Sequence, residues 1–243
     1  MPDRTENRLL AALSPSDYAL LLPYLRTTFF PRGAILQEQE APVANVYFPI
    51  GGMVSLVCVM QQGQCVETAV VGREGAVGVF AGLGPWNAFT RAIVQIPGSV
   101  AVVPTPHFQA AAHQSARLRE LILKYKESLL AQVQQTAACN AVHPLEARLA
   151  RWLLQALDRT GACELPLTQD AIAQMLGARR TTVTLIACRL QEAGLIRYRR
   201  GRIAILDRGG LEQAACECYR TIRRRTEAVI PSFEMGRVAE GTG

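Results

Sequence analysis

No stretch of this 243-residue sequence approaches 18 uninterrupted apolar residues, so we expect no membrane-spanning helix. The first residues, Met1 to Glu6, lack the basic start and apolar block of a signal peptide, and we therefore expect a cytoplasmic protein. Internal repeats and low-complexity segments are also missing. With 49% hydrophobic and 19% charged residues, the chain has the composition of a globular protein and the length for two domains.

The usual signatures of catalysis are missing as well. We find no phosphate-binding loop, no nucleophile elbow, no paired carboxylates in a glycine setting and no metal-ligand spacing. The turn-like run Gly72–Gly75 is too weak to predict a phosphate cradle. We therefore predict that the protein is not an enzyme and has no cofactor.

Histidine is scarce, and the seven cysteines include no N-terminal cluster of the kind that holds iron and sulfur. The three histidines, His107, His113 and His143, are too scattered to predict a metal site. Cys58 and Cys65 lie in β-type runs and are interpreted as core residues. No metal site is predicted.

Two further groups of polar or sulfur side chains leave alternatives open. Cys216-x-Cys218 is read as a structural thiol pair rather than a metal site. Cys139 and His143 lie at a predicted hinge, where a packed or capping role is favoured over a redox, haem or metal role.

Lysine is absent from residue 144 onward, where 16 arginines face 11 acidic residues. Between Arg179 and Arg225 there are 12 arginines and 4 acidic residues. Charge concentrated in one half of a chain points to an anionic partner, most often nucleic acid, and the charge alone leaves this reading and a merely solubilising arginine-rich surface equally open. The arginines Arg223 to Arg225 could contact phosphates or form a solvated helix end.

The first half of the chain reads as a helix followed by strands. A helical period covers Ser14–Leu25, with Ser14 or Ser16 as the cap. Short β-type runs with turn residues between them then extend from Thr28 to Pro104, which is typical of an all-β sandwich, roll or barrel. The clearest runs are Ala44–Pro49, Met53–Met60, Cys65–Val71, Ala92–Ile96 and Val100–Val103.

A long amphipathic helix is predicted from about Pro106 to Cys139, because no proline or glycine interrupts that stretch. Its apolar positions are Leu118, Leu121, Ile122, Tyr125, Leu129 and Val133. This seam could pack on the β-domain or on its own copy in a second chain, and we favour the homodimer.

Two short helices joined by a glycine turn follow a helix that runs from Pro144 to Asp158. Thr168 caps the first, Gly177 ends it, and the second starts at Arg179. In a helix-turn-helix the second helix enters the major groove with its first residues against base edges. The residues predicted to bind DNA there are Thr168, Gln169, Arg179, Arg180, Thr181, Thr182 and Thr184.

A two-stranded hairpin with Gly201 at its turn is predicted directly after these helices. Its tip carries Arg199, Arg200 and Arg202, which we expect to lie near phosphates. Helix, turn, helix and hairpin in this order form a winged helix, and the ordered combination is far more specific than any single part.

The chain as a whole resembles transcriptional regulators of the Crp/Fnr superfamily. The resemblance rests on the runs 46–54 and 72–84, on Glu146–Leu154, on Leu167–Gly177 and on Arg180–Val183. It implies an α+β fold: a cyclic-nucleotide-binding-like β-roll (jelly roll) over 1–105, a dimerisation helix and hinge over 106–142, and a winged helix-turn-helix domain over 143–243.

The recognition helix departs from the family pattern at two positions. Relatives carry a Glu after the first Arg and often a second Arg four residues later, whereas this chain has Thr181 and Leu185 after Arg180. Glutamate accepts a hydrogen bond from cytosine N4, and threonine has no comparable preference. The best-known operator of the family is therefore not expected to be the target here.

The effector site departs from the family pattern too. Cyclic-AMP binders have Gly-Glu for the ribose and Arg-Ser/Thr-Ala for the phosphate, whereas this chain has Gly78-Val79 and Thr90-Arg91. Val79 removes the ribose acceptor, and a one-residue slip turns Arg91 to the other face of its strand. We expect a different small effector, or none.

The leading hypothesis is a homodimeric regulator that binds a pseudo-palindromic operator in double-stranded DNA and contacts RNA polymerase. The alternative is a cyclic-nucleotide-binding regulatory module that acts on a protein partner. That alternative has no use for Arg179, Arg180 and an arginine-tipped wing, which is why we rank it second.

Overall fold

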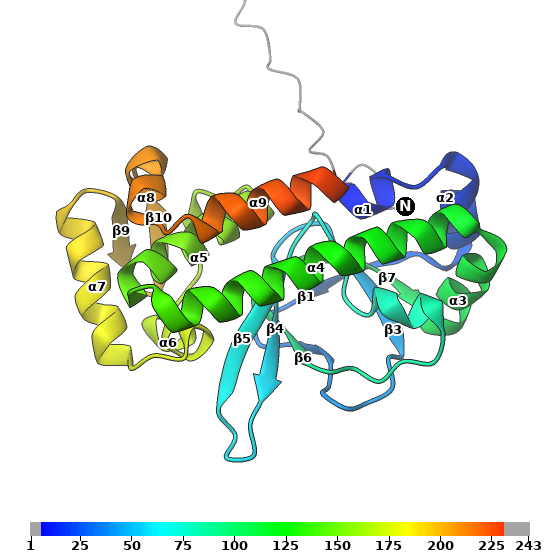
Figure 1. Cartoon of the computed structure of the whole chain (residues 1–243), viewed down its shortest axis with the longest axis horizontal. Coiled ribbons are helices and arrows are strands. Elements are labelled where there is room, and N and C mark those ends of the chain that lie inside the picture. Colours follow the sequence, from blue (N-terminus) through cyan, green and yellow to red (C-terminus); the bar gives the residue numbers. More distant parts are fainter. Residues whose placement is uncertain (1–5, 231–243) are drawn as a thin grey trace, which may run out of the picture.

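The computed structural model describes residues 6–230, which form a β-rich half, a long helix and a helical half (Figure 1). The chain begins with α1 (Arg8–Ala11), α2 (Pro15–Leu21) and a 3-10 turn, η2 (Leu22–Tyr24). Ser14 caps α2 as expected, because its hydroxyl accepts a hydrogen bond from the Asp17 amide. Within these residues, no helix is both long and apolar enough to cross a bilayer.

Seven strands build the β-roll as two antiparallel sheets, ordered β1-β7-β3 and β2-β6-β4-β5. The strands are β1 (Arg26–Phe30), β2 (Ile35–Gln37), β3 (Asn45–Pro49), β4 (Met53–Val59), β5 (Cys65–Val71), β6 (Arg91–Ile96) and β7 (Gly98–Pro104), with a short 3-10 segment, η3 (Val79–Leu83), between β5 and β6. The five predicted runs each form a strand. The predicted β-roll fold is therefore confirmed, and β1 and β2 are additions to it.

The helix predicted over 106–139 is two helices, α3 (Thr105–Gln114) and α4 (Ala116–Val142). Ser115 lies between them in an extended conformation, with φ −116° and ψ 114°, and its hydroxyl accepts a hydrogen bond from the Leu118 amide. A serine that caps a following helix interrupts the chain without proline or glycine. The prediction of a single helix was therefore wrong at this point.

The apolar seam of α4 packs against the β-roll of its own chain. Leu118, Ile122 and Tyr125 are buried in one core cluster with Phe48 and Phe108, and Leu129 and Val133 pack against a second. The seam that we assigned to a second copy is thus largely occupied within the protomer. The large apolar side chains of α4 that are instead exposed are Leu123, Leu130 and, at its C-terminal end, Val142.

Up to residue 230, the helical half contains five helices and a small antiparallel sheet of order β8-β10-β9. Its elements are α5 (Leu145–Thr160), β8 (Glu164–Leu165), α6 (Gln169–Leu176), α7 (Arg180–Glu192), β9 (Ile196–Arg199), β10 (Arg202–Ile205), α8 (Arg208–Ala214) and α9 (Cys218–Val229). Gly161 and Gly177 end α5 and α6 in the left-handed conformation, with φ of 67° and 60°. The predicted winged-helix order is therefore present.

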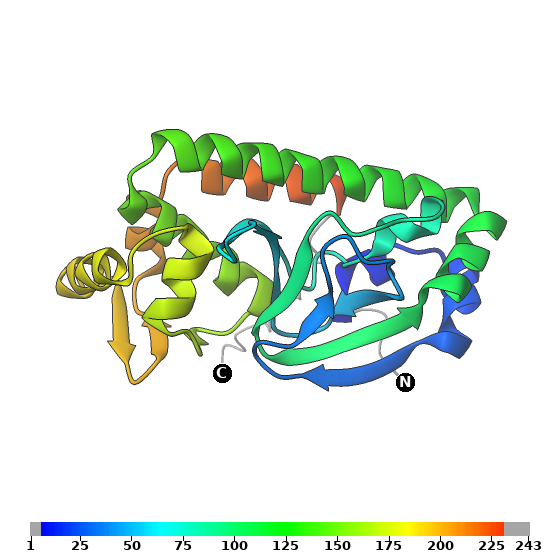
Figure 2. The same ribbon diagram turned by 90° about the horizontal axis from the view of Figure 1, so that it is seen from below.

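Helix α9 runs back along α4, away from the wing, and brings the end of the described chain beside α1 (Figures 1 and 2). The Arg8 guanidinium donates a hydrogen bond to the Ile230 carbonyl at that end. Arg223 forms an ion pair with Glu227 at 2.9 Å on the same helix. Arg223 to Arg225 therefore form part of the exposed face of α9 and do not join the wing. Residues 231–243 of the predicted tail lie outside the described residues.

The β-roll and the helical half share one hydrophobic core. Met53, Val57 and Val70 of the β-roll belong to the same cluster as Trp152 of α5 and Met175 of α6. The Trp152 indole also donates a 2.7 Å hydrogen bond to the buried Glu67 carboxylate of β5. This contact fixes where the winged helix lies relative to the β-roll.

Candidate nucleic-acid interface

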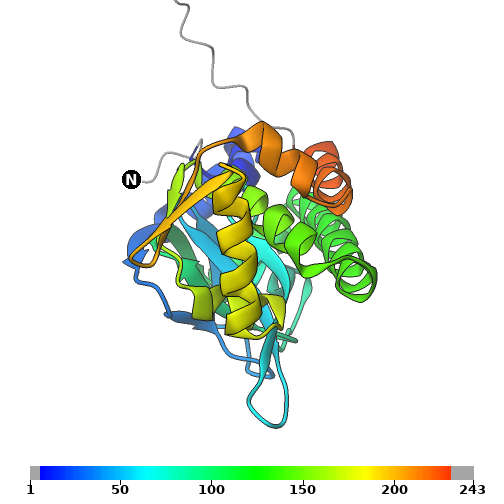
Figure 3. The same cartoon turned by 90° about the vertical axis from the view of Figure 1, so that its left-hand side faces the viewer.

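Helices α6 and α7 place one face in the core and leave the other free. The Thr168 hydroxyl accepts the Ala171 amide at 3.3 Å, which starts α6 as predicted. The inward face of α7 consists of Val183, Ile186, Ala187 and Leu190, all buried. The start and outer face of α7 are thereby presented at one end of the molecule, beside the wing (Figure 3).

The predicted contact residues around the start of α7 divide into two groups. Arg179, Thr181 and Thr182 are exposed, and their side chains make no hydrogen bond within the part of the chain that the structure describes. Thr184 is half-buried, and its hydroxyl donates to the Gln169 side chain at 2.7 Å. Gln169 therefore supports the second helix, whereas the start of α7 is free for a ligand.

Arg180 is held only weakly. Its guanidinium lies 3.4 Å from the Asp170 carboxylate, and both side chains are about two thirds exposed, 66% and 65%. An exposed ion pair of this kind contributes about 0–1 kcal/mol, because water screens it. Arg180 can therefore exchange Asp170 for a base edge or phosphate at little cost.

Thr168 serves the fold more than the interface. Besides capping α6, its hydroxyl accepts a 3.1 Å hydrogen bond from Arg32 of the β-roll. Of the predicted DNA contacts, it is the one that the structure ties to the other half of the molecule. A direct role for Thr168 at DNA stays a prediction.

The wing carries its arginines on a tight turn. Strands β9 and β10 pair with Arg199 opposite Arg202, and the two residues between them, Arg200 and Gly201, have φ of 49° and 74°. Positive φ at both central residues is the type I′ geometry that suits the twist of a hairpin. Arg199, Arg200 and Arg202 are exposed as a result, and among residues 6–230 an acidic partner is present only for Arg202, with Glu164 at 3.1 Å.

Arg197 completes this positive surface, and the sequence analysis missed it. It lines one surface hollow with Arg199, Arg200 and Arg202, with Glu164 as the acidic group at that hollow. Alternation along β9 places residues 197 and 199 on one face of the strand. This two-residue alternation along a strand was the feature of the sequence that could have identified Arg197.

The predicted effector residues do not all meet. A cavity of about 370 Å³ between the β-roll and α4 is lined by Gly78 and Thr90, together with mostly apolar side chains. Val79 is 1% exposed and belongs to the core, and Arg91 pairs with Glu38 at 2.7 Å. Neither side chain lines that cavity, so the four predicted residues do not form one site.

Gly78 explains why the backbone at this cavity tolerates no side chain. Its φ is 77°, and a Cβ there would lie 2.7 Å from the Asn45 carbonyl oxygen. Glycine is needed here for both its conformation and its close approach to the neighbouring strand.

Comparisons with known proteins agree on one family. Residues 147–214 match the model of the Crp-like helix-turn-helix domain. The chain is 26% identical to the global nitrogen regulator of Synechococcus elongatus over 76% of this chain and 87% of the relative. It is 25% identical to the CRP-like cAMP-activated global transcriptional regulator of Mycobacterium tuberculosis, over 85% of this chain and 96% of that protein.

Solved structures show the same fold. FixK2 from Bradyrhizobium japonicum superposes with a TM-score of 0.67 at 18% identity, over 79% of this chain and 98% of that one. A CRP/FNR-family transcriptional regulator from Thermus thermophilus superposes with a TM-score of 0.62 at 25% identity, over 78% of this chain and 98% of that one. The similarity thus extends across the β-roll, the long helix and the winged helix.

Proposed function

Since this chain is a DNA-binding transcriptional regulator of the Crp/Fnr superfamily, we propose that it acts as a homodimer on a pseudo-palindromic operator. The observation that supports this most is the free, arginine-rich start of α7 beside an arginine-tipped wing. Two such surfaces related by a two-fold axis match half-sites about 34 Å apart, one helical turn of DNA. An enzymatic role has no place in this proposal.

The dimer would form through the outer face of α4. Leu123 and Leu130 are 48% and 53% exposed and lie seven residues apart, and the exposed Ala137 continues the spacing. A seven-residue repeat of apolar side chains on a helix favours pairing with a parallel copy. Because the β-roll and α9 pack on other parts of α4, this exposed stripe is available to a partner.

Within each half-site, Arg180 would read guanine through two hydrogen bonds to O6 and N7. Thr181 and the 54% exposed Leu185 lie on the same outer face of α7 and favour contact with thymine methyl groups. Arg179, Arg197, Arg199, Arg200 and Arg202 would bind phosphates, which position the protein without reading sequence.

The β-roll would respond to a largely apolar effector rather than to cyclic AMP. Leu56, Phe80 and Trp86 are among the side chains that line the cavity, and Arg91 is engaged with Glu38. Neither Val79 nor Arg91 offers the acceptor and the cation that a cyclic nucleotide needs. Calorimetric titration should therefore show no tight one-to-one binding of cyclic AMP or cyclic GMP.

We place this regulator in the cytoplasm, where it would meet both its operator and RNA polymerase. Selection of bound sequences from a random DNA pool tests the proposal. Wild-type protein should enrich a two-fold symmetric site, and Arg180→Ala should blur one position in each half-site at a cost of about 1–3 kcal/mol.

A matched control is Arg224→Ala, which removes the same charge from the exposed face of α9. It should leave both affinity and sequence preference unchanged. If Arg180→Ala weakens specific and random DNA equally, α7 does not read bases, and sequence choice comes from DNA shape.

A further inference from the structure

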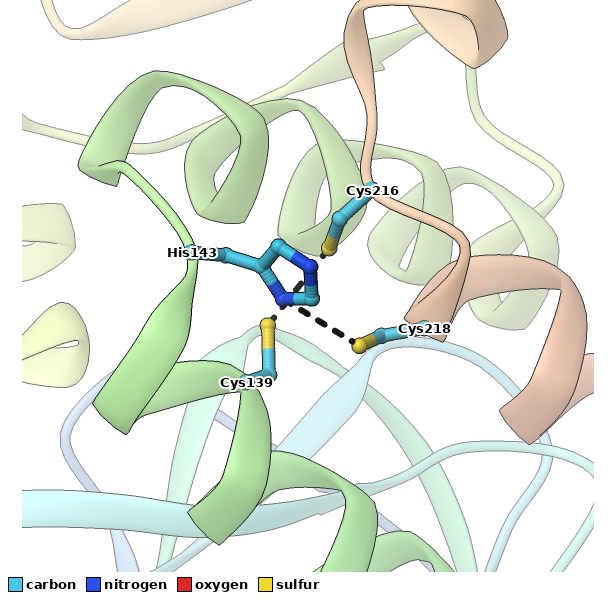
Figure 4. A group of neighbouring side chains, drawn as sticks. All are labelled: Cys139, His143, Cys216 and Cys218. Carbon is cyan, nitrogen blue, oxygen red and sulfur yellow. Dashed lines mark hydrogen bonds between the residues drawn. The ribbon is translucent and has the colours of Figure 1, made fainter.

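Four side chains with metal-binding atoms meet where α4 ends and α9 begins (Figure 4). Cys139 lies near the end of α4 and His143 caps that end, while Cys216 lies in the link between α8 and α9 and Cys218 begins α9. The Sγ atoms and a ring nitrogen of His143 all lie within 4.8 Å of one another. Cys139 Sγ is 3.5 Å from Cys216 Sγ, and Cys218 Sγ is 3.5 Å from His143 Nδ1.

The fold brings these residues together from two distant segments. Residues four apart on a helix share a face, so Cys139 and His143 point the same way. Helix α9 lies along α4, which carries Cys216 and Cys218 to that face. The three sulfur-bearing residues are buried, and the His143 side chain is 20% exposed. The two pairs are separate in the sequence, and the fold brings them together.

We propose that Cys139, His143, Cys216 and Cys218 bind a single Zn²⁺ ion in tetrahedral geometry. Zinc binds thiolate sulfur at about 2.3 Å and imidazole nitrogen at about 2.0–2.1 Å, and a tetrahedron with these bonds separates its ligand atoms by roughly 3.5–3.8 Å. The two 3.5 Å contacts, between Cys139 and Cys216 and between Cys218 and His143, have nearly that length. Three sulfurs and one imidazole are a ligand set that suits Zn²⁺ better than harder cations.

The surroundings of the four ligands support the same assignment. Glu217 lies 3.2 Å from His143 Nε2, whereas the other ring nitrogen, Nδ1, lies 3.5 Å from Cys218 Sγ. A carboxylate there holds the proton on Nε2 and leaves the Nδ1 lone pair for the metal, an arrangement found at many zinc sites. The Gln135 amide donates to Cys218 Sγ at 3.0 Å, which stabilises a thiolate.

Buried positive charge lies beside the cluster. Zn²⁺ with three thiolates carries a net charge of −1, and Arg151, 3% exposed, is close enough to act on Cys139. Arg148 also lies within electrostatic range of Cys139 and Cys216. An anionic zinc–thiolate centre would balance these guanidinium groups.

Two alternative roles for these cysteines, a disulfide and an iron–sulfur cluster, would require a different geometry. A disulfide between Cys139 and Cys216 would shorten their 3.5 Å separation to about 2.05 Å and would leave His143 and Cys218 without a role. An iron–sulfur cluster spreads its ligands over several metal ions, whereas the ligand atoms here converge on one point. A single ion uses all four side chains.

The test measures zinc in the full-length protein, purified without chelator, by mass spectrometry of its metal content. We expect one zinc per chain. Removal of zinc and titration with Co²⁺ should produce the visible and near-ultraviolet absorption of a tetrahedral cobalt site with thiolate ligands. Cys218→Ser and His143→Gln should lose zinc and the cobalt spectrum.

Matched controls change the same residue types elsewhere. Cys163→Ser and His113→Gln alter exposed side chains outside the cluster and should keep one zinc per chain. His143→Cys supplies a fourth sulfur and should retain the metal with an altered cobalt spectrum, which separates loss of a ligand from loss of folding.

Several results would overturn the proposal. One is wild-type protein that takes up neither Zn²⁺ nor Co²⁺ after reduction of its thiols. Another is zinc that stays bound in both Cys218→Ser and His143→Gln. A third is a Cys139–Cys216 disulfide, detected by thiol counting and a loss of two mass units, in protein isolated without zinc. None of these readouts depends on DNA binding.

Discussion

Arg200 occupies the first central position of the wing turn with a φ of 49°, a conformation that arginine adopts at some cost. Asparagine adopts this conformation more readily than arginine and carries no charge. We expect Arg200→Asn to unfold at equal or higher denaturant concentration, with a gain of up to about 1 kcal/mol.

DNA binding by the same variant should weaken for all sequences alike, with a salt dependence reduced by about one unit of slope. Fluorescence anisotropy at several salt concentrations, beside Arg224→Ala, measures this. Unchanged DNA affinity would contradict the phosphate contact at the wing tip.

Glu67 provides a second prediction for a single residue. Burial raises the pKa of its carboxyl to about 7, although hydrogen bonds from Ser55 and Trp152 act in the opposite direction. The folded pKa lies above the ordinary value of 4.5, so the folded state holds the proton more tightly. The contribution of this carboxyl group to the stability of the fold is therefore fully present below about pH 4.5 and is lost as the pH rises through about 7.

Glu67→Gln keeps the shape and removes the ionisation. Between pH 5 and 7.5 the unfolding free energy of Glu67→Gln should decrease less than that of the wild type. The difference between the two decreases should be at most on the order of 3 kcal/mol. Urea unfolding across this pH range checks it, with the exposed Glu127→Gln as the control. Parallel pH profiles for wild type and Glu67→Gln would show that the carboxyl is ionised throughout.

At the scale of one element, α4 has two apolar faces with different duties. Ile122 is 1% exposed in the β-roll core, so a glutamate there should unfold the protomer. Leu123 and Leu130 face outward, and Leu123→Glu with Leu130→Glu should give folded monomers. Sedimentation equilibrium with circular dichroism distinguishes these outcomes.

The control for this pair is Leu206→Glu, which changes a leucine that is 54% exposed outside α4. It should remain as dimeric as the wild type. The assignment of the outer face fails if wild-type protein is monomeric at micromolar concentration or if the double variant stays dimeric.

At the scale of the whole molecule, the proposed zinc site would join the hinge between the two halves to the helix that returns along α4. Loss of the metal should loosen the α8–α9 link at the end of α4, because only weaker contacts, such as the Gln135–Cys218 hydrogen bond and the His143–Glu217 ion pair, would then hold it among the described residues. We expect Cys218→Ser to lower the melting temperature by several degrees and to speed tryptic cleavage around Arg220–Arg225. Added zinc should restore the melting temperature and the resistance to trypsin of the wild-type apoprotein but not of this variant. Cys163→Ser should behave like the wild type.

The placement of the winged helix also depends on the contact between halves. Arg32 reaches Thr168, Gln95 reaches Met175, and Glu67 reaches Trp152 across the shared core. A regulator that moves its two α7 helices relative to each other must change this contact or the hinge. An effector that bound in the neighbouring cavity, between the β-roll and α4, would be placed to act on both.

The sequence alone determined the features set by neighbouring residues. Thr168 and Gly177 mark the ends of α6, the buried period of Val183, Ile186 and Leu190 defines α7, and Gly201 marks the wing turn. Capping, helical period and turn geometry act over a few residues, so the sequence displays them directly. The family resemblance and the candidate DNA-binding surface followed from these signals.

Tertiary structure decided the features that depend on packing over long distances. The period of α4 cannot say whether its seam faces the β-roll or a second chain, because both partners are apolar. Cys139 and Cys216 are 77 residues apart, and only the return of α9 along α4 brings their sulfur atoms to 3.5 Å. Such contacts are selected by the burial of whole faces against one another, which no local pattern records.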